Sequence, residues 1–177
     1  MPTGTKLVAG LAVLALTLGV VSWWYRFESA HRSTEFWGPT AAELINQSSH
    51  VTASTLAPAT EATADEEAEL LVLDDEQFIP IRVHDVTKVP GMLLLRKSLL
   101  TDRNYAWHRE VKSPHWHYCL LFAEDGQESR LLFSKDFTVV GILESARLRA
   151  VDCQPMAETL RQYCTSAKLF DASKTSE

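Results

Sequence analysis

The stretch HWHYCLLFAEDGQESRLLFSKDFTVVGILESARLRAV, residues 115–151, predicts four consecutive strands. Runs rich in Val, Ile, Leu, Phe and Tyr alternate in it with short polar segments that are typical of turns. Strands joined by two-residue turns must run antiparallel, so the stretch predicts an antiparallel sheet. The expected strands cover residues 116–123, 130–134, 137–143 and 146–151, and the expected turns are Asp125-Gly126, Lys135-Asp136 and Glu144-Ser145.

Two helices are predicted on either side of these strands. Pro90 opens a segment whose apolar residues recur every three or four positions, and Pro155 opens another that runs to Phe170. In the first helix we expect Arg96 and Lys97 to face the solvent. The inward-facing positions of the two helices are expected to be Met92, Leu95, Leu99, Met156, Leu160, Tyr163, Cys164 and Ala167.

A hairpin completes the predicted domain. Residues 70–73 and 78–83 are strand-like runs on either side of a short acidic turn. Pro80 has no N–H to donate, so its strand is expected at an edge of the sheet. Together these elements predict a small α+β domain over residues 70–170, in which a mainly antiparallel sheet packs on two or three helices.

An uncharged segment precedes this domain. LVAGLAVLALTLGVVSWWY, residues 7–25, would span about 28 Å as a helix, close to the thickness of the hydrocarbon core of a bilayer. Trp23, Trp24 and Tyr25 have amphipathic rings of the kind found at membrane interfaces, and Arg26 follows in the aqueous flank. The segment therefore predicts an uncleaved signal-anchor, the transmembrane helix of a single-pass membrane protein whose first partner is the lipid bilayer.

Two alternatives stay open for residues 7–25. A cleaved signal peptide also follows a positive charge, but its apolar region usually has about 7–15 residues. A buried helix would normally carry a polar face, whereas Thr17 and Ser22 are the only polar side chains here apart from the aromatic rings. A short N-terminus ahead of an uncleaved signal usually stays in the cytosol, so the soluble domain is expected to be extracytoplasmic.

The composition divides the chain into segments. Residues 48–69 are rich in Ser, Thr, Ala and acids, and they have too little apolar surface to offset the entropy of ordering, so a flexible linker is expected. A short helix is expected from Pro39 or Thr40, with Leu44 and Ile45 facing inward. The expected organisation is a tail over 1–6, the anchor over 7–25, a juxtamembrane linker and short helix over 26–47, the acidic linker over 48–69, the domain over 70–170 and a disordered tail over 171–177.

The net charge argues against one class of partner. The formal charge is −6, with 17 Lys and Arg against 23 Asp and Glu. Binding of nucleic acid depends on clustered cations that neutralise phosphates, and the sequence has no basic stripe. DNA and RNA are therefore not expected as partners. The three cysteines, Cys119, Cys153 and Cys164, allow at most one disulfide bridge.

Two histidines in the opening stretch are candidate metal ligands. His115 and His117 stand two positions apart, so in a regular strand their side chains share a face and can reach one ion. Cys119 shares that face, but it lies roughly 13 Å from His115 along a strand, too far to bind the same ion. The alternative interpretation is a pair of exposed imidazoles where the strand begins, with Trp116 on the opposite, buried face. We expect no cofactor and no metal, and keep this pair as the candidate.

The sequence contains no catalytic motif. It lacks G-x-S-x-G, G-x-x-x-x-G-K-[ST], G-x-G-x-x-G, H-E-x-x-H and C-x-x-C. We therefore expect a membrane-anchored, non-catalytic interaction or accessory domain with an unknown protein partner, and not an enzyme. The alternative from another class is a small metal-binding protein or metal-dependent enzyme that uses His115 and His117.

Overall fold

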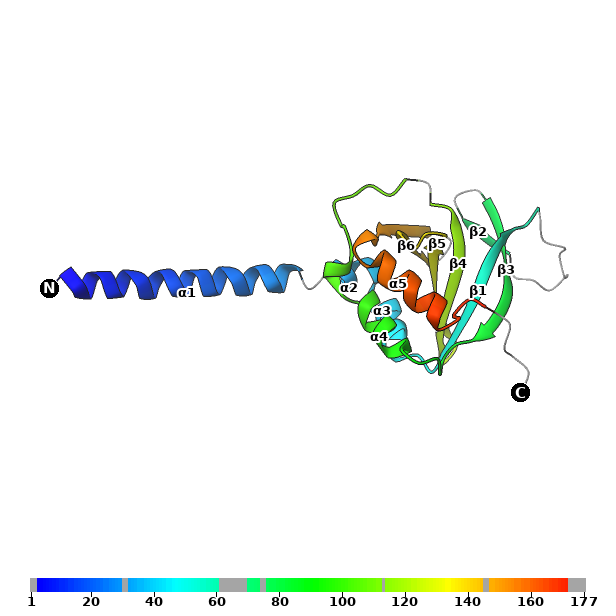
Figure 1. Cartoon of the computed structure of the whole chain (residues 1–177), viewed down its shortest axis with the longest axis horizontal. Helices are drawn as coiled ribbons and strands as arrows, with labels where there is room; N and C mark the ends of the chain where they lie inside the picture. The colour runs from blue at the N-terminus through cyan, green and yellow to red at the C-terminus, as the bar shows by residue number, and fades with distance from the viewer. Residues whose placement is uncertain are drawn as a thin grey trace.

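The structure, a computed structural model, describes residues 3–29, 32–60, 70–73, 76–112, 114–144 and 147–171 of the chain. A long N-terminal helix leads into a domain in which strands lie on one side and shorter helices on the other (Figure 1). The helices are α1 (Thr3–Ser29), α2 (Arg32–Trp37), α3 (Pro39–Gln47), α4 (Met92–Leu99), a 3-10 turn η1 (Asp102–Asn104) and α5 (Gln154–Ser166).

The strands of the described residues form one sheet with the order β2-β3-β1-β4-β5-β6-β7. Every neighbouring pair is antiparallel. Short turns join β4 to β5 and β5 to β6, and β6 pairs with β7, so the meander predicted from residues 115–151 is present. Residues 145–146, on which the expected Glu144-Ser145 turn falls, lie outside the described residues. The strands are β1 (His50–Pro58), β2 (Leu71–Leu73), β3 (Glu76–Asp85), β4 (Trp116–Glu124), β5 (Gln127–Ser134), β6 (Val139–Glu144) and β7 (Arg147–Asp152).

The sheet has a hydrophobic core on each of its two faces. The helix-side core lies between the sheet and the helices, and Trp37, Leu99, Phe122 and Phe133 are among its most deeply buried members. The barrel-side core fills the opposite face, where the curled sheet packs against itself. Its buried members are Leu56, Leu71, Leu73, Phe78, Trp116, Cys119 and Leu132.

The predicted fold class, an α+β domain whose sheet packs on two or three helices behind a transmembrane helix, is wrong. The seven strands form an antiparallel near-barrel, to which a few helices are added. Each strand of a sheet is rotated relative to the next, so seven of them coil far enough for the inner face to enclose a core without help from helices. A strand's sequence shows which of its faces are apolar, but it does not show how far the sheet will coil.

The strand that makes the near-barrel possible comes from the expected flexible linker over 48–69. Residues 50–58 form β1, which lies between β3 and β4 and is mostly buried. Its Ser, Thr and Ala side chains resemble a linker, yet two flanking strands satisfy its backbone hydrogen bonds, and Val51, Ala53 and Leu56 are buried. The expectation for this half of the segment is therefore wrong. Residues 61–69 and 172–177, for which flexibility was expected, lie outside the described residues.

The prediction of a membrane anchor over residues 7–25 is also wrong. Those residues lie in α1, where Leu16 and Val21 are 71% and 63% exposed. Within the described residues, however, no helix combines the length and the apolar character that crossing a bilayer requires.

Three further predictions depended on that anchor. The chain was predicted to be a transmembrane, single-pass membrane protein, and its domain was predicted to be extracytoplasmic. Neither prediction is supported once the anchor is withdrawn. Of the residues expected at a membrane interface, Trp23 and Trp24 are exposed on α1. The side chains of Tyr25 and Arg26 lie outside the described part of the structure.

The α4 helix agrees with its predicted inner face except at one position. Met92, Leu95 and Leu99 are buried as expected, but Arg96 is only 7% exposed, although it was predicted to face the solvent. Its guanidinium donates to the carbonyls of Asn46, at 3.3 Å, and Ser48, at 2.8 Å. These carbonyls stand at the C-terminal end of α3, where a helix leaves acceptors without partners and favours a cation.

Candidate functional site

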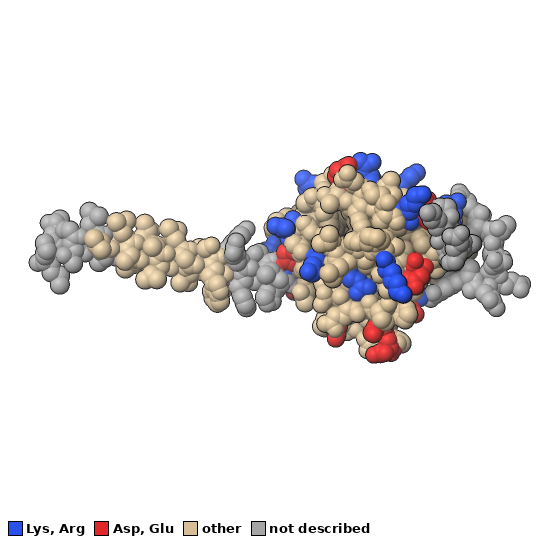
Figure 2. Space-filling model, turned by 60° about the horizontal axis from the view of Figure 1, so that its bottom comes forward, with Lys and Arg blue, Asp and Glu red and all other residues tan. Residues whose placement is uncertain are grey.

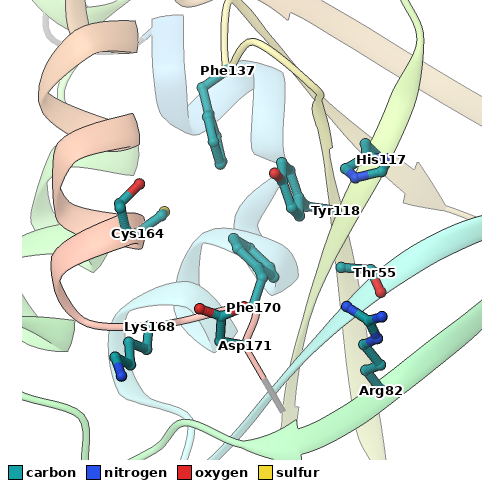
Figure 3. A pocket seen from close by; sticks show the side chains of 10 residues that line it. Thr55, Arg82, His117, Tyr118, Phe137, Cys164, Lys168, Phe170 and Asp171 are labelled. Atoms are coloured by element: carbon teal, nitrogen blue, oxygen red, sulfur yellow. The ribbon is translucent and has the colours of Figure 1, made fainter. Parts of the chain in front are cut away.

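A cavity of about 230 Å³ opens at the C-terminal end of α5, and we call it the α5 pocket. Its walls come from β1, β3, β4, the loop between β5 and β6, and the residues that follow α5. Elements that are far apart in the sequence therefore meet here. Figure 3 shows aromatic rings along one side of this pocket and Arg82 and Thr55 on another.

The aromatic wall of the pocket is a cluster of rings that contact one another. The ring centroid of Tyr118 lies 4.8 Å from that of Phe137, with nearly parallel planes, and 4.4 Å from that of Phe170, while the centroids of Phe137 and Phe170 are 6.2 Å apart. The ring of His117 meets Tyr118 edge-on at 4.6 Å. Phe137 and Phe170 are buried, so this wall is rigid and excludes water from one side of the pocket.

The position of Phe137 is set by the loop between β5 and β6. The carboxylate of Asp136 accepts hydrogen bonds from the Ser134 hydroxyl, at 2.7 Å, and from the backbone and hydroxyl of Thr138, at 3.2 and 2.8 Å. Burial alone would raise the pKa of Asp136, but these hydrogen bonds together have the larger effect, so the pKa is lowered. The resulting tight turn holds Phe137 at a φ of 59°.

Arg82 reaches the pocket from a bulge in β3. Ala53 pairs with His84 and Thr55 pairs with Ile81, so one residue of β1 faces two residues of β3 between these pairs. Arg82 is one of the two, with a φ of 54°. A left-handed residue in such a bulge is usually glycine, because a side chain there costs about 1 kcal/mol or more.

Lys168 occupies a second position of the same kind, just beyond α5. The chain leaves the helix at Ser166 and Ala167, and the N–H of Leu169 then donates back to the carbonyl of Cys164 at 2.9 Å. This helix ending places Lys168 at a φ of 52°, where glycine is the usual residue. A lysine here is also favoured by the negative end of the helix dipole.

The strained positions of the described residues concentrate at this pocket. Arg82, Asp125, Phe137 and Lys168 are the residues other than glycine with positive φ. All except Asp125, which lies in the hairpin turn between β4 and β5, line the α5 pocket. Backbone strain of this kind gathers at functional sites more often than elsewhere, so the pocket is the strongest candidate site in the described part of the chain.

The charges around the pocket favour an anion. Arg82 and Lys168 are cationic, and Asp171 is the only acidic residue among the lining residues that the structure describes. No ion pair found among the described residues involves Arg82 or Lys168. Burial and, secondarily, the charge of Lys135 lower the pKa of His117, so this ring is neutral at pH 7. On the face that Figure 2 shows, basic and acidic side chains are interspersed.

Two of the three thiols, those of Cys153 and Cys164, are held in their protonated form. Cys164 lines the α5 pocket, and Cys153 donates its S–H to the carbonyl of Phe137 at 3.1 Å. Burial raises the pKa of both thiols to about 12. A nucleophilic cysteine needs a thiolate near neutral pH, so these groups serve as small apolar side chains.

The structure separates the two candidate metal ligands. His117 lines the α5 pocket, whereas His115 lines a different cavity, between β2 and β7. A register shift in the pairing of β4 with β5, between Trp116 and Tyr118, interrupts the alternation on which their shared face was predicted. In a regular strand Trp116 and Tyr118, two positions apart, would share a face, but the shift turns Trp116 into the barrel-side core while Tyr118 packs against the helix-side core. No three His, Cys, Asp or Glu residues in the described ranges converge on a point that could hold a metal ion.

Replacing both His115 and His117 by glutamine tests the metal alternative. We expect the free energy of unfolding to change by less than about 1 kcal/mol, since neither side chain is buried. Denaturant unfolding of the variant and of the unchanged chain, each with and without a chelator, measures this. A chelator that destabilises the unchanged chain and not the variant would establish a metal site.

The sequence interpretation did not identify Arg82, Phe137 and Lys168 as site residues. Their relevant property is a positive φ angle, which only glycine adopts freely, and no pattern of side chains in the sequence predicts it. The single available signal is the absence of glycine from a bulge and from a helix end. That signal can be read only after the register of β1 with β3 is known.

A comparison of this chain with models of known protein families, with curated proteins and with solved structures found no match.

Proposed function

We propose that this chain is a non-catalytic interaction domain, an accessory or assembly subunit that holds an acidic group of a protein partner in the α5 pocket. One observation carries the proposal. Two cations, Arg82 and Lys168, occupy positions where the backbone favours glycine, and both line the same pocket. A charged residue at either position makes the fold less stable than glycine would, and no ion pair among the described residues compensates for this loss.

The chemistry of the pocket suits a carboxylate. A guanidinium presents paired N–H donors that match the two oxygens of a carboxylate, and such charge-assisted bonds are about twice as strong as neutral ones. The apolar rings of Tyr118 and Phe170 border the site. They lower the local dielectric, which strengthens the attraction between Arg82 and an anion relative to the same pair in water.

Arg82→Gly tests whether the strain serves binding. We expect the free energy of unfolding to stay unchanged or to rise by up to about 1 kcal/mol, because glycine relieves the left-handed conformation. Binding of a probe peptide, six glutamates with an amidated C-terminus, should weaken at least about tenfold, as expected for loss of a charge-assisted hydrogen bond. Denaturant unfolding and an NMR titration that follows Thr55 and Tyr118 measure the two effects.

Asp125→Gly provides the matched control. Asp125 has a φ of 47° but lies in a hairpin turn outside the pocket, so its replacement should give a similar change in stability and no change in peptide binding. The proposal fails if the unchanged chain does not bind the peptide saturably, or if Arg82→Gly binds it as well as Asp125→Gly does.

A further inference from the structure

The near-barrel has a gap between its two outermost strands, β2 and β7. The two strands line a common cavity of about 520 Å³, which we call the β2–β7 cavity, and they are not hydrogen-bonded to each other. Leu73 comes from β2, and Leu148 and Ala150 come from β7. Most of the lining side chains are apolar, yet the accessible surface is more polar than apolar. A wall to which strand edges contribute their open backbone groups has this character.

The edge of β7 that faces the gap is open at two residues. Cys153 donates its backbone N–H to the carbonyl of Thr138 at 2.7 Å, and these two residues continue the register in which β6 pairs with β7. In an antiparallel ladder, the backbone groups of successive residues point to alternate sides. Every second residue counted back from Cys153 therefore bonds to β6, and Leu148 and Ala150 turn their N–H and C=O groups outward. Among the described residues, these outward groups have no backbone hydrogen bond.

The loop that precedes β4 covers only the far end of this edge. The N–H of Ala106 donates to the carbonyl of Asp152 at 2.8 Å, as expected if alternate residues of β7 face outward. Val111 of the same loop lines the cavity, but no backbone bond joins it to β7 in the described structure. Leu148 and Ala150 are partly exposed, so the edge is left open for another strand at these two residues.

The directions of the strands define the kind of segment that fits the gap. Every neighbouring pair in the sheet is antiparallel, so the order of the strands makes β2 and β7 run in the same direction. An antiparallel ladder cannot join these two strands to each other. One further strand that runs opposite to both could pair with each of them and close the barrel.

The side-chain faces of β2 and β7 agree with a single inserted strand. The N–H of Ala59 donates to the carbonyl of Gln77 at 2.8 Å, so Gln77 turns its backbone toward β1. Its partner in β2, Val72, then has its backbone groups on the outer edge, and its side chain is 55% exposed. On β7, by contrast, the side chains of Leu148 and Ala150 pack against the barrel-side core. An inserted strand would bond to β7 through its barrel-facing residues and to β2 through its solvent-facing residues, which is the alternation of one regular strand.

We propose that the β2–β7 cavity is a docking site for an extended segment of a partner protein, which adds to β7 as a further antiparallel strand and completes the barrel. Such strand addition is a recurring mode of peptide recognition. The segment alternates apolar residues, which enter the barrel-side core, with polar residues on the other face. On that face β7 presents Arg147, which is exposed, and Arg149, which pairs with Glu144 at 2.8 Å. Two cations against one carboxylate favour acidic residues among the polar ones. This inference does not rest on the function proposed for the α5 pocket.

The probe is the peptide acetyl-Thr-Val-Glu-Val-Glu-Val-Thr-amide, titrated into the ¹⁵N-labelled full chain. The amide resonances of Leu148 and Ala150 should shift saturably, and both amides should become protected from hydrogen exchange. The amides of Arg149 and Val151 face β6, so they should be protected with and without the peptide and serve as the internal control. The same peptide with N-methylated valines should bind at least about tenfold more weakly, because it loses the hydrogen bonds to β7 and keeps its charges.

Two variants test the edge itself. Ala150→Pro removes an N–H that takes no part in the sheet, so it should fold and bind the peptide at least about tenfold more weakly. Ala150→Ser is the matched control, because it keeps the N–H, and it should bind as the unchanged chain does. An excess of the six-glutamate peptide used for the α5 pocket should not displace the probe.

Five results would overturn the proposal. The first three are the absence of a saturable shift up to the solubility limit of the peptide, equal binding of the N-methylated peptide, and displacement of the probe by the six-glutamate peptide. The fourth is undiminished binding to Ala150→Pro that its spectrum shows to be folded. The fifth is protection of Leu148 and Ala150 in the free chain, since another part of the chain or a second copy would then occupy the edge.

Discussion

Replacing Trp37 by alanine is expected to lower the free energy of unfolding by about 3–5 kcal/mol, the usual range for removing a large aromatic side chain from a core. Trp37 is fully buried. The centroid of its ring system lies 4.7 Å from that of Phe36 and 6.2 Å from that of Tyr105, both in edge-to-face arrangements. Its Nε1 donates to the carbonyl of Leu99 at 2.9 Å. The change removes both the packing and a bond that joins the end of α2 to the end of α4, and urea unfolding measures the loss.

Trp37→Phe separates these two contributions. It keeps most of the apolar contact and removes the N–H, while the Tyr105 hydroxyl still donates to the Leu99 carbonyl. The expected loss is about 1–2 kcal/mol, from one hydrogen bond and a small cavity. A loss below about 1 kcal/mol for Trp37→Ala would show that α2 and α3 are not part of the cooperative domain.

Replacing Arg96 by methionine should have the second largest effect, a loss of about 2–4 kcal/mol. Methionine retains the aliphatic contacts but leaves the carbonyls of Asn46 and Ser48 without their donor. The bond to Ser48 is buried and the bond to Asn46 is partly buried, and a buried acceptor without a partner costs about 1–3 kcal/mol. The guanidinium also stands 5.6 Å from the centre of the Phe122 ring, an additional favourable contact. Burial lowers the pKa of Arg96, yet arginine stays charged in proteins.

Lys97→Met is the matched control for this prediction. Lys97 is the next residue of α4 and is exposed, so the same chemical change should alter the free energy of unfolding by less than about 0.5 kcal/mol. Equal effects at the two positions would contradict the role assigned to Arg96. Thermal unfolding of the two variants side by side distinguishes these outcomes.

Local sequence patterns were sufficient for the meander and for the main helices. The Asp125-Gly126 turn and the alternation on either side of it predict β4 and β5, because a two-residue turn restricts the strands to one antiparallel arrangement. The inward-facing Leu44 and Ile45 of α3, and Met156, Leu160 and Cys164 of α5, follow from the helical repeat in the same way and are buried. These features depend on residues a few positions apart, whose side-chain directions the backbone repeat determines.

The prediction that the strand of Pro80 lies at an edge of the sheet is wrong, although the missing N–H on which it was based does matter locally. The missing N–H suggested an edge strand, whereas β3 lies between β2 and β1. However, β2 pairs only with residues 76–78, so within the described residues Pro80 stands where β3 has a neighbouring strand on one side alone. The residue type predicts a missing hydrogen bond, and the length of β2 decides where that is tolerated.

The candidate site was not predictable from local patterns, for a reason that Arg82 makes plain. Its left-handed conformation results from the bulge between β1 and β3, and β1 itself was taken for a linker. The opposite error occurred at His115 and His117, where a regular alternation was assumed and a register shift at the start of β4 separated the two side chains. In both cases the position of a functional side chain depends on a partner strand.

The sequence by itself determined the antiparallel meander, the amphipathic faces of α3 to α5 and the acidic character of the chain, because each depends on residue type and on the short repeat of helix or strand. Only the tertiary structure decided that β1 enters the sheet, that seven strands coil into a near-barrel, and that Trp116, Arg96 and Arg82 face the surroundings they do. The physical reason is that these features depend on residues far apart in the chain. Hydrogen bonds join one strand to another, and the side chain of Arg96 to the end of a neighbouring helix. Their register reverses the face of a side chain with a shift of a single residue.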